Sequence, residues 1–417
     1  MRTLLKKILH SLPVYIQAKL IILYENYFRY ICYEKEKEEY SIIKKSKILG
    51  KQKKRILVYH ISGLGIGGTE KTLQTVANNL CSDFEVFFLY SNKNVFVDRH
   101  EIINKQVKCI EFAYTKKDST YPFYIHGMNP HIKNIIQEHN IELLITADSG
   151  YTQYPINTIL DIPIILINIF GSPSLQKNIL STLFISNTVQ KHSEKYTGRR
   201  DGNKTLYIPI TLPPKEARAR AQEIRNTFGI LDTDFVFGRI GRNSDSIFDS
   251  IAIKAFKKIV SNNSETHYII MSPPPILEKI VKDENIPNVH FLPPSGNETD
   301  IWGFHYSLDS LAHFRNDGET FGLNIVESMY AGNPIISHTS HIWNAHLEYL
   351  NQTFSRIVNK DDYETYAHHM QDFITIKRNK PIKWETMRES AHEYAKNNFL
   401  EKQYTDTIKQ IINKIPQ

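Results

Sequence analysis

The chain has 417 residues, which is enough for two domains that each bury a full hydrophobic core. Its hydrophobic content of 41% and its mean hydropathy of −0.37 are those of a soluble protein. Its three cysteines, Cys32, Cys81 and Cys109, have no paired spacing, so the sequence predicts neither a disulfide framework nor a zinc site. We therefore expect a reducing, cytoplasmic location.

The net charge of +7 is concentrated at the N-terminus. Residues 1–55 carry 14 Lys and Arg against 5 Asp and Glu, whereas the remaining 362 residues carry 37 basic and 39 acidic side chains. The body of the chain is therefore almost neutral, which argues against a nucleic-acid partner.

Residues 1–33 alternate cationic and apolar side chains and are rich in Tyr and Phe. Lys19, Glu25 and Arg29 interrupt the apolar runs, so none approaches the ~20 residues that span a bilayer. Such a basic amphipathic segment suits peripheral contact at the inner membrane face. It equally suits a helix packed on the body of the protein or an arm that binds a partner. We assign residues 1–54 to this arm and a charged linker.

Residues 55–60 predict a buried strand, which a glycine-rich loop connects to a helix over 71–80 and a strand over 84–90. Strand and helix patterns then alternate as far as residue 212, which predicts a Rossmann-like domain over 55–212. A helix over 213–230 and a strand over 235–241 open a second α/β domain, over 213–395. Residues 396–417 predict a closing helix.

The glycine-rich loop satisfies the spacing of a dinucleotide site, G-x-G-x-x-G, at Gly63, Gly65 and Gly68. That site needs a carboxylate at the end of the second strand to hold a ribose, and residues 91–93 are Ser-Asn-Lys. An NAD-dependent dehydrogenase is therefore disfavoured. A tight strand-to-helix turn without a ligand is a further alternative.

The most informative stretch is residues 315–333, RNDGETFGLNIVESMYAGN. It predicts a turn, then an apolar helix with Thr320 as its N-cap and Gly332 just beyond its end. Glu319 would precede this helix, and Glu327 would lie on its second turn.

The backbone N–H groups of Phe321, Gly322 and Leu323 would point forward from the start of this helix, where they can hold a phosphate. Gly322 would let a ligand approach the backbone closely. Two carboxylates beside such a helix end suit a ligand that carries both phosphates and hydroxyls, such as a nucleotide-sugar. The alternative is an ordinary amphipathic helix with one solvated glutamate.

The run ETFGLNIVE followed by SMYAGNPIIS resembles the E-x7-E signature of retaining GT-B glycosyltransferases of the group 1, or GT4-like, family. Its departures from the family pattern are Thr320, Ser328 and Tyr330. The resemblance extends over about residues 55–415, and the segment from Gly67 to Glu70 resembles the family's GG-x-E loop under the donor diphosphate.

Arg242, in FGRIGRNSDSIF, resembles the family's arginine that holds the donor diphosphate. The lysine expected five residues further on is replaced by Ile247. Either Arg239 or another residue supplies the second cation, or donor binding is weakened. Where the family often has a histidine near the sugar, this chain has Asn168. A surface salt bridge is the alternative role for Arg242. The D-x-D pattern that ends at Asp234 precedes a strand, so we expect a loop there and no metal site.

The resemblance implies an α/β protein of the GT-B fold, with two facing Rossmann-like domains, a cleft between them and a C-terminal helix that crosses back to the first domain. It implies transfer of a hexose from a UDP- or GDP-linked sugar to a glycan or lipid-linked acceptor, as in polysaccharide biosynthesis, with retention of configuration, no metal and no cofactor. The implied catalytic residues are Glu319 and Arg242. The implied donor-binding residues are Glu327, Gly322, Leu323, Phe321, Gly67, Gly68 and Arg239.

A GT-B-shaped binding or scaffold subunit that has lost its chemistry is the main alternative. Ile247 and the missing histidine favour it, and the pair Glu319 and Glu327 disfavours it.

Overall fold

The computed structural model describes residues 53–60, 63–92, 95–112, 130–148, 159, 161–172, 176–198 and 202–414. Nearly all of the predicted N-terminal arm, including residues 1–33, lies outside them. The chain divides into two compact units, and the second contains residues 207–417 together with residues 65–68 and 96–102. In the part of the chain that the structure describes, no helix has the length and apolar character to cross a membrane.

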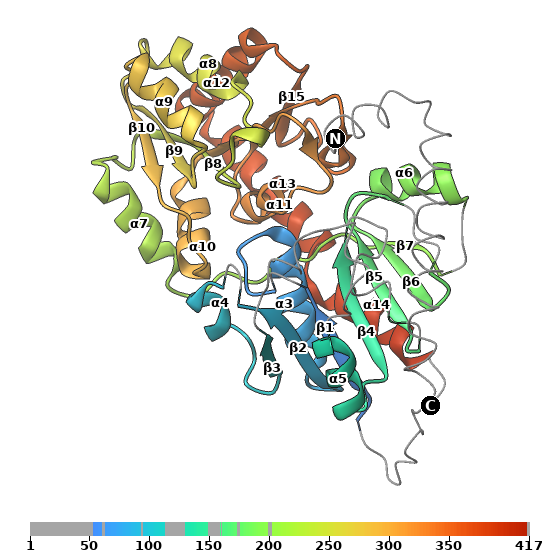
Figure 1. The fold of residues 1–417 in the computed structure, drawn as a ribbon. Helices are drawn as coiled ribbons and strands as arrows, with labels where there is room; N and C mark the ends of the chain where they lie inside the picture. The colour runs from blue at the N-terminus through green and yellow to red at the C-terminus, as the bar shows by residue number, and fades with distance from the viewer. Residues whose placement is uncertain are drawn as a thin grey trace. The chain divides into compact units, whose positions relative to one another are not determined.

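The first unit contains a seven-stranded parallel sheet with the strand order β3-β2-β1-β4-β5-β6-β7 (Figure 1). Its strands are β1 (Arg55–Tyr59), β2 (Glu85–Ser91), β3 (Lys108–Phe112), β4 (Leu143–Asp148), β5 (Ile164–Asn168), β6 (Ile179–Phe184) and β7 (Lys204–Thr205). Three helices follow strands of this sheet, namely α3 (Gly68–Leu80), α5 (Pro130–Glu138) and α6 (Asn187–Thr197). The predicted strand–helix–strand opening of this unit is therefore confirmed.

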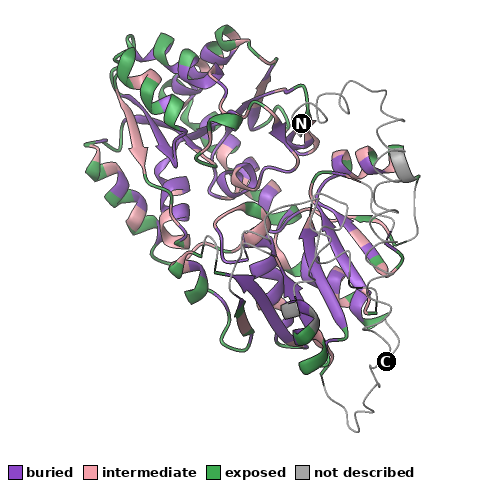
Figure 2. Ribbon diagram, viewed as in Figure 1, coloured by how far each residue is buried: buried purple, intermediate pink, exposed green. Residues whose placement is uncertain are grey.

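Strand β1 shows why an apolar run in the sequence predicts a strand of this sheet. Ile56, Leu57 and Val58 are all fully buried, because helices cover both faces of a parallel sheet and every residue of a central strand must then be apolar. On one face, Leu57 joins a cluster with Ile132 and Ile135 of α5. Figure 2 shows the strands as the buried layer of this unit.

The second unit contains a six-stranded parallel sheet with the order β10-β9-β8-β11-β13-β15. Its strands are β8 (Phe235–Ile240), β9 (Thr266–Met271), β10 (Val289–Leu292), β11 (Ser310–Ala312), β13 (Ile335–His338) and β15 (Ser355–Val358), with a two-stranded ladder of β12 (Gly318–Glu319) and β14 (Trp343–Asn344) beside them. Its helices are α4 (Val97–Glu101), α7 (Ala217–Thr227), α8 (Ile251–Val260), α9 (Pro275–Asp283), α10 (Glu298–Ser307), α11 (Leu323–Tyr330), α12 (Tyr363–Asn379), α13 (Pro381–Asn398) and α14 (Glu401–Asn413), with 3-10 turns η4 (Asp245–Ile247) and η5 (Ala345–Glu348).

In both sheets the first strand is central, and the second and third strands are added in turn on one side of it. The fourth strand pairs with the opposite edge of the first strand. This is the doubly wound order of Rossmann-like domains, and it confirms the predicted α/β fold class. The cleft between the units, the crossing of the C-terminal helix and the domain limits at residues 54, 212 and 395 stay predictions.

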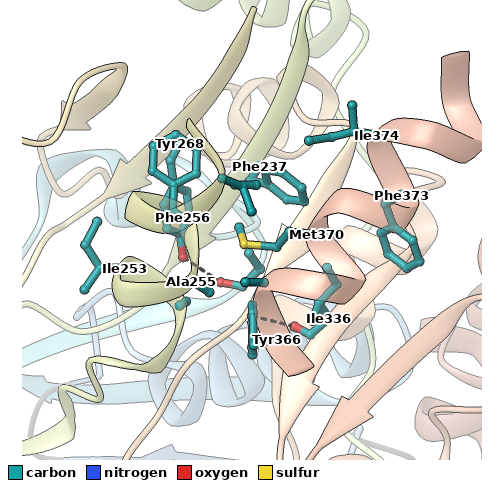
Figure 3. Close-up of a cluster of buried hydrophobic side chains, with 14 of the residues drawn as sticks. Phe237, Ile253, Ala255, Phe256, Tyr268, Ile336, Tyr366, Met370, Phe373 and Ile374 are labelled. Carbon is teal, nitrogen blue, oxygen red and sulfur yellow. Dashed lines mark hydrogen bonds between the residues drawn. The ribbon is translucent and has the colours of Figure 1, made fainter. Parts of the chain in front are cut away.

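Helices α8 and α12 contribute to one large apolar cluster on the second sheet (Figure 3). Phe256 and Met370 from these helices cluster with Phe237 of β8. Two buried tyrosine hydroxyls donate hydrogen bonds to strand carbonyls, from Tyr268 to Ala312 at 2.7 Å and from Tyr366 to Ile336 at 3.1 Å. The first bond reaches the last residue of β11, and the second reaches β13, the strand that pairs with it.

Two local predictions have different outcomes. The apolar run LYIPI at residues 206–210 predicts a last strand of the first domain, and this prediction is wrong, because Ile210 forms only an isolated bridge to Leu400 and Pro209 has no N–H to donate to a ladder. The loop expected around Asp234 is confirmed, and the Asp234 carboxylate accepts a hydrogen bond from the N–H of Leu231 at 2.8 Å.

Candidate active site

The candidate site lies at the carboxyl ends of β8 and β11, which are neighbours at the point where the strand order reverses. Ligands of doubly wound sheets bind at this position, because the loops on either side of it diverge. The loop after β8 carries Arg242, and the loop after β11 runs from His313 to Glu319 and leads to helix α11. The segments that carry Arg242 and Glu319 thus lie at the same edge of the second sheet.

Helix α11 begins differently from the prediction. Gly322, rather than Thr320, is its N-cap, with φ of 92° and no capping side chain, so the expectation for Thr320 is wrong. The end of the helix is as predicted. The N–H of Gly332 donates to the carbonyl of Met329 and that of Asn333 to the carbonyl of Ser328, which is a Schellman ending.

The first turn of α11 has backbone N–H groups that are not paired within the described residues. Among the described residues, the N–H groups of Phe321, Gly322 and Leu323 have no protein acceptor. The Asn324 side chain donates to the carbonyl oxygen of Ile240 at 2.7 Å, which ties the start of the helix to the loop that carries Arg242. The helix dipole and the guanidinium therefore come from adjacent segments, and both favour a negatively charged ligand.

We expect Gly322→Ala to destabilise the protein by roughly 1–2 kcal/mol. A Cβ at this position would lie 3.0 Å from the Tyr349 hydroxyl and 3.0 Å from Ile325 Cδ1, on a backbone with φ of +92°. The unfolding midpoint in urea would measure the effect, with Gly229→Ala as a matched control, since Gly229 also has a positive φ of +66° but open space around its Cα. Equal midpoints for the two variants would mean that backbone strain alone, and not the contacts at Gly322, sets the loss.

Glu319 is 8% exposed, and its carboxylate has one short hydrogen bond and one longer ionic contact. Oε1 accepts a hydrogen bond from His313 Nε2 at 3.0 Å, and Oε2 lies 3.7 Å from Arg315 Nη1. Arg315 is fixed in turn by two hydrogen bonds to Asp317, at 2.7 and 3.1 Å. The Cγ of Glu319 would lie 3.4 Å from a Cβ built on Gly322, so this side chain is beside the start of α11.

These contacts keep Glu319 anionic. Burial by itself would raise the pKa of its carboxyl group, but the charge of Arg315 and the hydrogen bond from His313 outweigh burial and lower the pKa to about 2. The pKa of nearby His346 is also lowered, to about 3, because burial and the neighbouring His313 disfavour its charged form. Glu319 is therefore a hydrogen-bond acceptor at neutral pH, and His346 is uncharged.

We expect Glu319 to contribute to stability at neutral pH and to lose this contribution in acid. Its pKa falls from 4.5 to about 2 on folding, so the stabilisation is present above pH 4.5 and is lost as the pH falls toward 2. Urea titrations at several pH values should show wild-type stability falling by up to about 3 kcal/mol more than that of Glu319→Gln over this window. Parallel curves for the two proteins would contradict the assignment.

Glu327 lies on the second turn of α11, as predicted, but it is only 4% exposed. Its Oε2 is 3.6 Å from Nε2 of His305, a fully buried residue of α10. The predicted contact with ribose hydroxyls stays a prediction.

The sequence predicts that Arg242 and a second cation hold the diphosphate, and the residues considered for these two positions differ in burial. Arg242 is exposed, and no carboxylate in the described part of the chain lies within ion-pair distance of it, so the salt-bridge alternative has no support there. Ile247 is 4% exposed and supplies no charge. Arg239 is 2% exposed, with its guanidinium 4.5 Å from the centre of the Phe314 ring, and burial lowers its pKa to about 10. Arg242 is thus the accessible cation of this loop.

The predicted glycines of the first loop are assigned to the second unit by their contacts. Gly67 is half-buried and Gly68, the first residue of α3, is exposed. A Cβ on Gly68 would lie 4.0 Å from Leu323 Cδ2. Asn168, at the position of the family's histidine, is 1% exposed and accepts a hydrogen bond from the N–H of Gly171 at 2.7 Å.

His313 and Arg315 are site residues that sequence reasoning missed. His313 stands at the end of β11, six residues before Glu319, and no periodic pattern links the two. The usable signal was the topology, because a polar residue that directly follows a central parallel strand lies at the ligand-binding edge of the sheet.

One segment of this chain matches a known protein family, and the chain as a whole has the fold of several solved structures. Residues 221–398 match the family model described as "Glycosyl transferases group 1". No curated protein sequence matches the chain significantly. A glycosyltransferase structure from Rickettsia africae has a TM-score of 0.67 at 14% identity, covering 88% of this chain and 100% of that one.

Two further solved structures are similar over nearly the whole chain. HepE from Anabaena, in complex with UDP-glucose, has a TM-score of 0.65 at 16% identity, covering 87% of this chain and 100% of its own. Sucrose-phosphate synthase from Thermosynechococcus elongatus has a TM-score of 0.65 at 13% identity, covering 87% and 98%. These likenesses establish the fold as GT-B. The chain therefore has the GT-B fold, and its residues 221–398 match the group 1 glycosyltransferase model.

Proposed function

We propose that this protein transfers a hexose from a UDP- or GDP-linked sugar to a hydroxyl of a glycan or lipid-linked acceptor, with retention of anomeric configuration and without a metal. One observation carries the proposal. An accessible Arg242, the unpaired backbone N–H groups at the start of α11 and the anionic Glu319 lie on adjacent segments at the switch point of the second sheet. Cationic and amide donors beside a fixed carboxylate match a ligand that joins a diphosphate to a polyol.

Each group has a distinct role in this proposal. Arg242 and the N–H groups of Gly322 and Leu323 stabilise the negative charge that develops on the departing diphosphate. Glu319 accepts hydrogen bonds from hydroxyls of the donor sugar, since its carboxylate stays ionised at neutral pH. Glu327 holds the ribose hydroxyls.

The remaining predicted donor contacts keep supporting roles. Phe321 contributes its N–H beside that of Gly322, Gly67 and Gly68 allow a close approach to the phosphates, and Arg239 adds positive charge from beneath the site.

The transfer needs no separate base from the chain. The bond between the anomeric carbon and the diphosphate oxygen breaks, and the acceptor oxygen bonds to the same face of that carbon. The proton of the acceptor hydroxyl passes to the departing phosphate oxygen. Stabilisation of that oxygen by Arg242 is therefore the main electrostatic contribution of the protein.

A panel of UDP- and GDP-hexoses tests the donor half of this proposal. We expect one donor to be hydrolysed slowly in the absence of an acceptor, and the same donor and its nucleotide to raise the unfolding temperature. Proton NMR of the released or transferred sugar would give its anomeric configuration. No hydrolysis and no thermal shift with any member of the panel would argue strongly against the assignment.

A binding or scaffold subunit is the second candidate, and the buried Ile247 in place of a lysine favours it. Glu319→Ala separates the two, because a scaffold keeps its cellular function after this change and an enzyme does not.

Residues 1–33 support a lipid-linked acceptor, since a basic amphipathic arm would hold the enzyme near such substrates at the membrane. Deleting residues 1–45 should abolish binding to anionic liposomes, and unchanged binding would refute that role.

A further inference from the structure

The orientation of Glu319 is set by a neighbour whose role no motif specifies. A buried carboxylate needs donors to remain ionised, and one that must also accept bonds from a sugar needs an oxygen left over. Oε1 takes the hydrogen bond from His313, while Oε2 has only the long 3.7 Å approach of Arg315. Arg315 is itself committed to Asp317. The His313 bond is therefore the one short side-chain contact to this carboxylate within the described residues.

His313 is held rigidly in the position that this bond requires. It is 2% exposed, its backbone N–H donates to Ile336 at 2.8 Å, and its carbonyl accepts from the Tyr366 hydroxyl at 2.9 Å. Its Nδ1 lies 3.1 Å from the Ser337 hydroxyl oxygen. Because a hydroxyl either donates or accepts, Nε2 carries a proton toward Glu319 in both the neutral and the charged ring.

The other buried imidazoles nearby are engaged elsewhere. Nε2 of His346 donates to the carbonyl of His338 at 3.1 Å. His338 donates from Nδ1 to the carbonyl of Thr339 at 2.8 Å, and its Nε2 accepts from the backbone N–H of Arg315 at 3.2 Å. Neither ring bonds to Glu319, so neither replaces His313.

We propose that His313 is a positioning residue for donor-sugar recognition, which locks the Glu319 carboxylate through Oε1 so that Oε2 faces the sugar hydroxyls. This inference rests on the proposed function of Glu319. It predicts that His313 affects binding of the sugar part of the donor and has no effect on binding of the nucleotide part. Ser337 assists by holding Nδ1.

A matched pair of substitutions tests it. The amide nitrogen of glutamine reaches about as far as imidazole Nε2, whereas that of asparagine reaches only as far as Nδ1. Calorimetric titrations with UDP and UDP-glucose, or with GDP and GDP-mannose, would give the gain in affinity that the sugar provides. We expect His313→Asn to reduce this gain roughly 10- to 100-fold, and His313→Gln to keep it within about threefold. Affinity for UDP or GDP alone should not change in either variant.

Each other result has a definite meaning. Equal losses in both variants would show that His313 acts by packing, and no loss in His313→Asn would show that it has no role, so either outcome overturns the proposal. If His313→Asn does not fold, Ser337→Ala decides, because it should reduce the sugar-dependent gain roughly two- to fivefold. An unchanged gain there also overturns the proposal.

Glu319→Gln separates this inference from the proposed function. If the wild-type protein binds no member of the panel, the proposed function fails and the inference fails with it. If the wild-type protein binds a donor but Glu319→Gln leaves the sugar-dependent gain intact, the proposed role of Glu319 fails and the inference fails with it. If Glu319→Gln loses the gain while His313→Asn keeps it, Glu319 recognises the sugar and the positioning role alone is wrong.

Discussion

Glu319→Gln is expected to reduce kcat/KM for sugar transfer by roughly 100- to 1,000-fold. The substitution keeps the size of the side chain and an acceptor for His313, but it removes the negative charge that Arg315 faces at 3.7 Å. A carboxylate accepts strong charge-assisted bonds from sugar hydroxyls, whereas an amide presents a donor at one of the two positions. Both affinity for the sugar and its orientation during transfer should therefore suffer.

Initial rates with the donor found in the panel would measure this effect. Glu389→Gln, on the exposed face of α13, is a matched control that should leave the rate unchanged. Circular dichroism at neutral pH should show that Glu319→Gln is folded. A folded variant with a rate within about threefold of the wild type would remove Glu319 from the mechanism.

Arg242→Ala is expected to reduce kcat/KM roughly 100-fold and to weaken binding of the free nucleotide diphosphate as well. Arg242 is the accessible cation of its loop, because Ile247 is apolar and Arg239 is buried against Phe314. Loss of Arg242 therefore leaves the amide groups of α11, with the buried Arg239, to hold the phosphates. Arg242→Lys should recover part of the lost activity, since it restores the positive charge but not the bidentate hydrogen bonding of a guanidinium group.

Two measurements make this prediction specific. The unfolding temperature should stay within about 2 °C of wild type, because Arg242 is exposed. Lys383→Ala, which removes an exposed cation from α13, controls for the change in overall charge. If Arg242→Ala and Lys383→Ala bind UDP or GDP with equal affinity, Arg242 is not a diphosphate ligand.

Glu319→Gln and Arg242→Ala should differ in their effect on binding of the free nucleotide. Glu319→Gln should spare binding of the free nucleotide, whereas Arg242→Ala should weaken it, because the carboxylate addresses hydroxyls and the guanidinium addresses phosphates. This contrast between two residues of one site distinguishes a nucleotide-sugar enzyme from a scaffold that keeps only the fold.

The sequence by itself determined the features that depend on local chemistry. The apolar run at β1 and the alternation of strands with helices predicted two Rossmann-like units, because a parallel strand covered on both faces leaves no place for polar side chains. Gly332 predicted the end of α11, because a Schellman ending requires a left-handed residue there. The motif also placed Glu319 before α11 and Glu327 within it.

The tertiary structure decided which of the motif residues are accessible and what holds them. Arg239 and Arg242 are three residues apart in one motif, yet the strand directs the first against Phe314 in the interior while the second follows the strand and is exposed. The bond from His313 to Glu319 depends on the packing of β11 beside β13 and on the loop that returns across them. Contacts of this kind arise from strand order and burial, which no local pattern encodes.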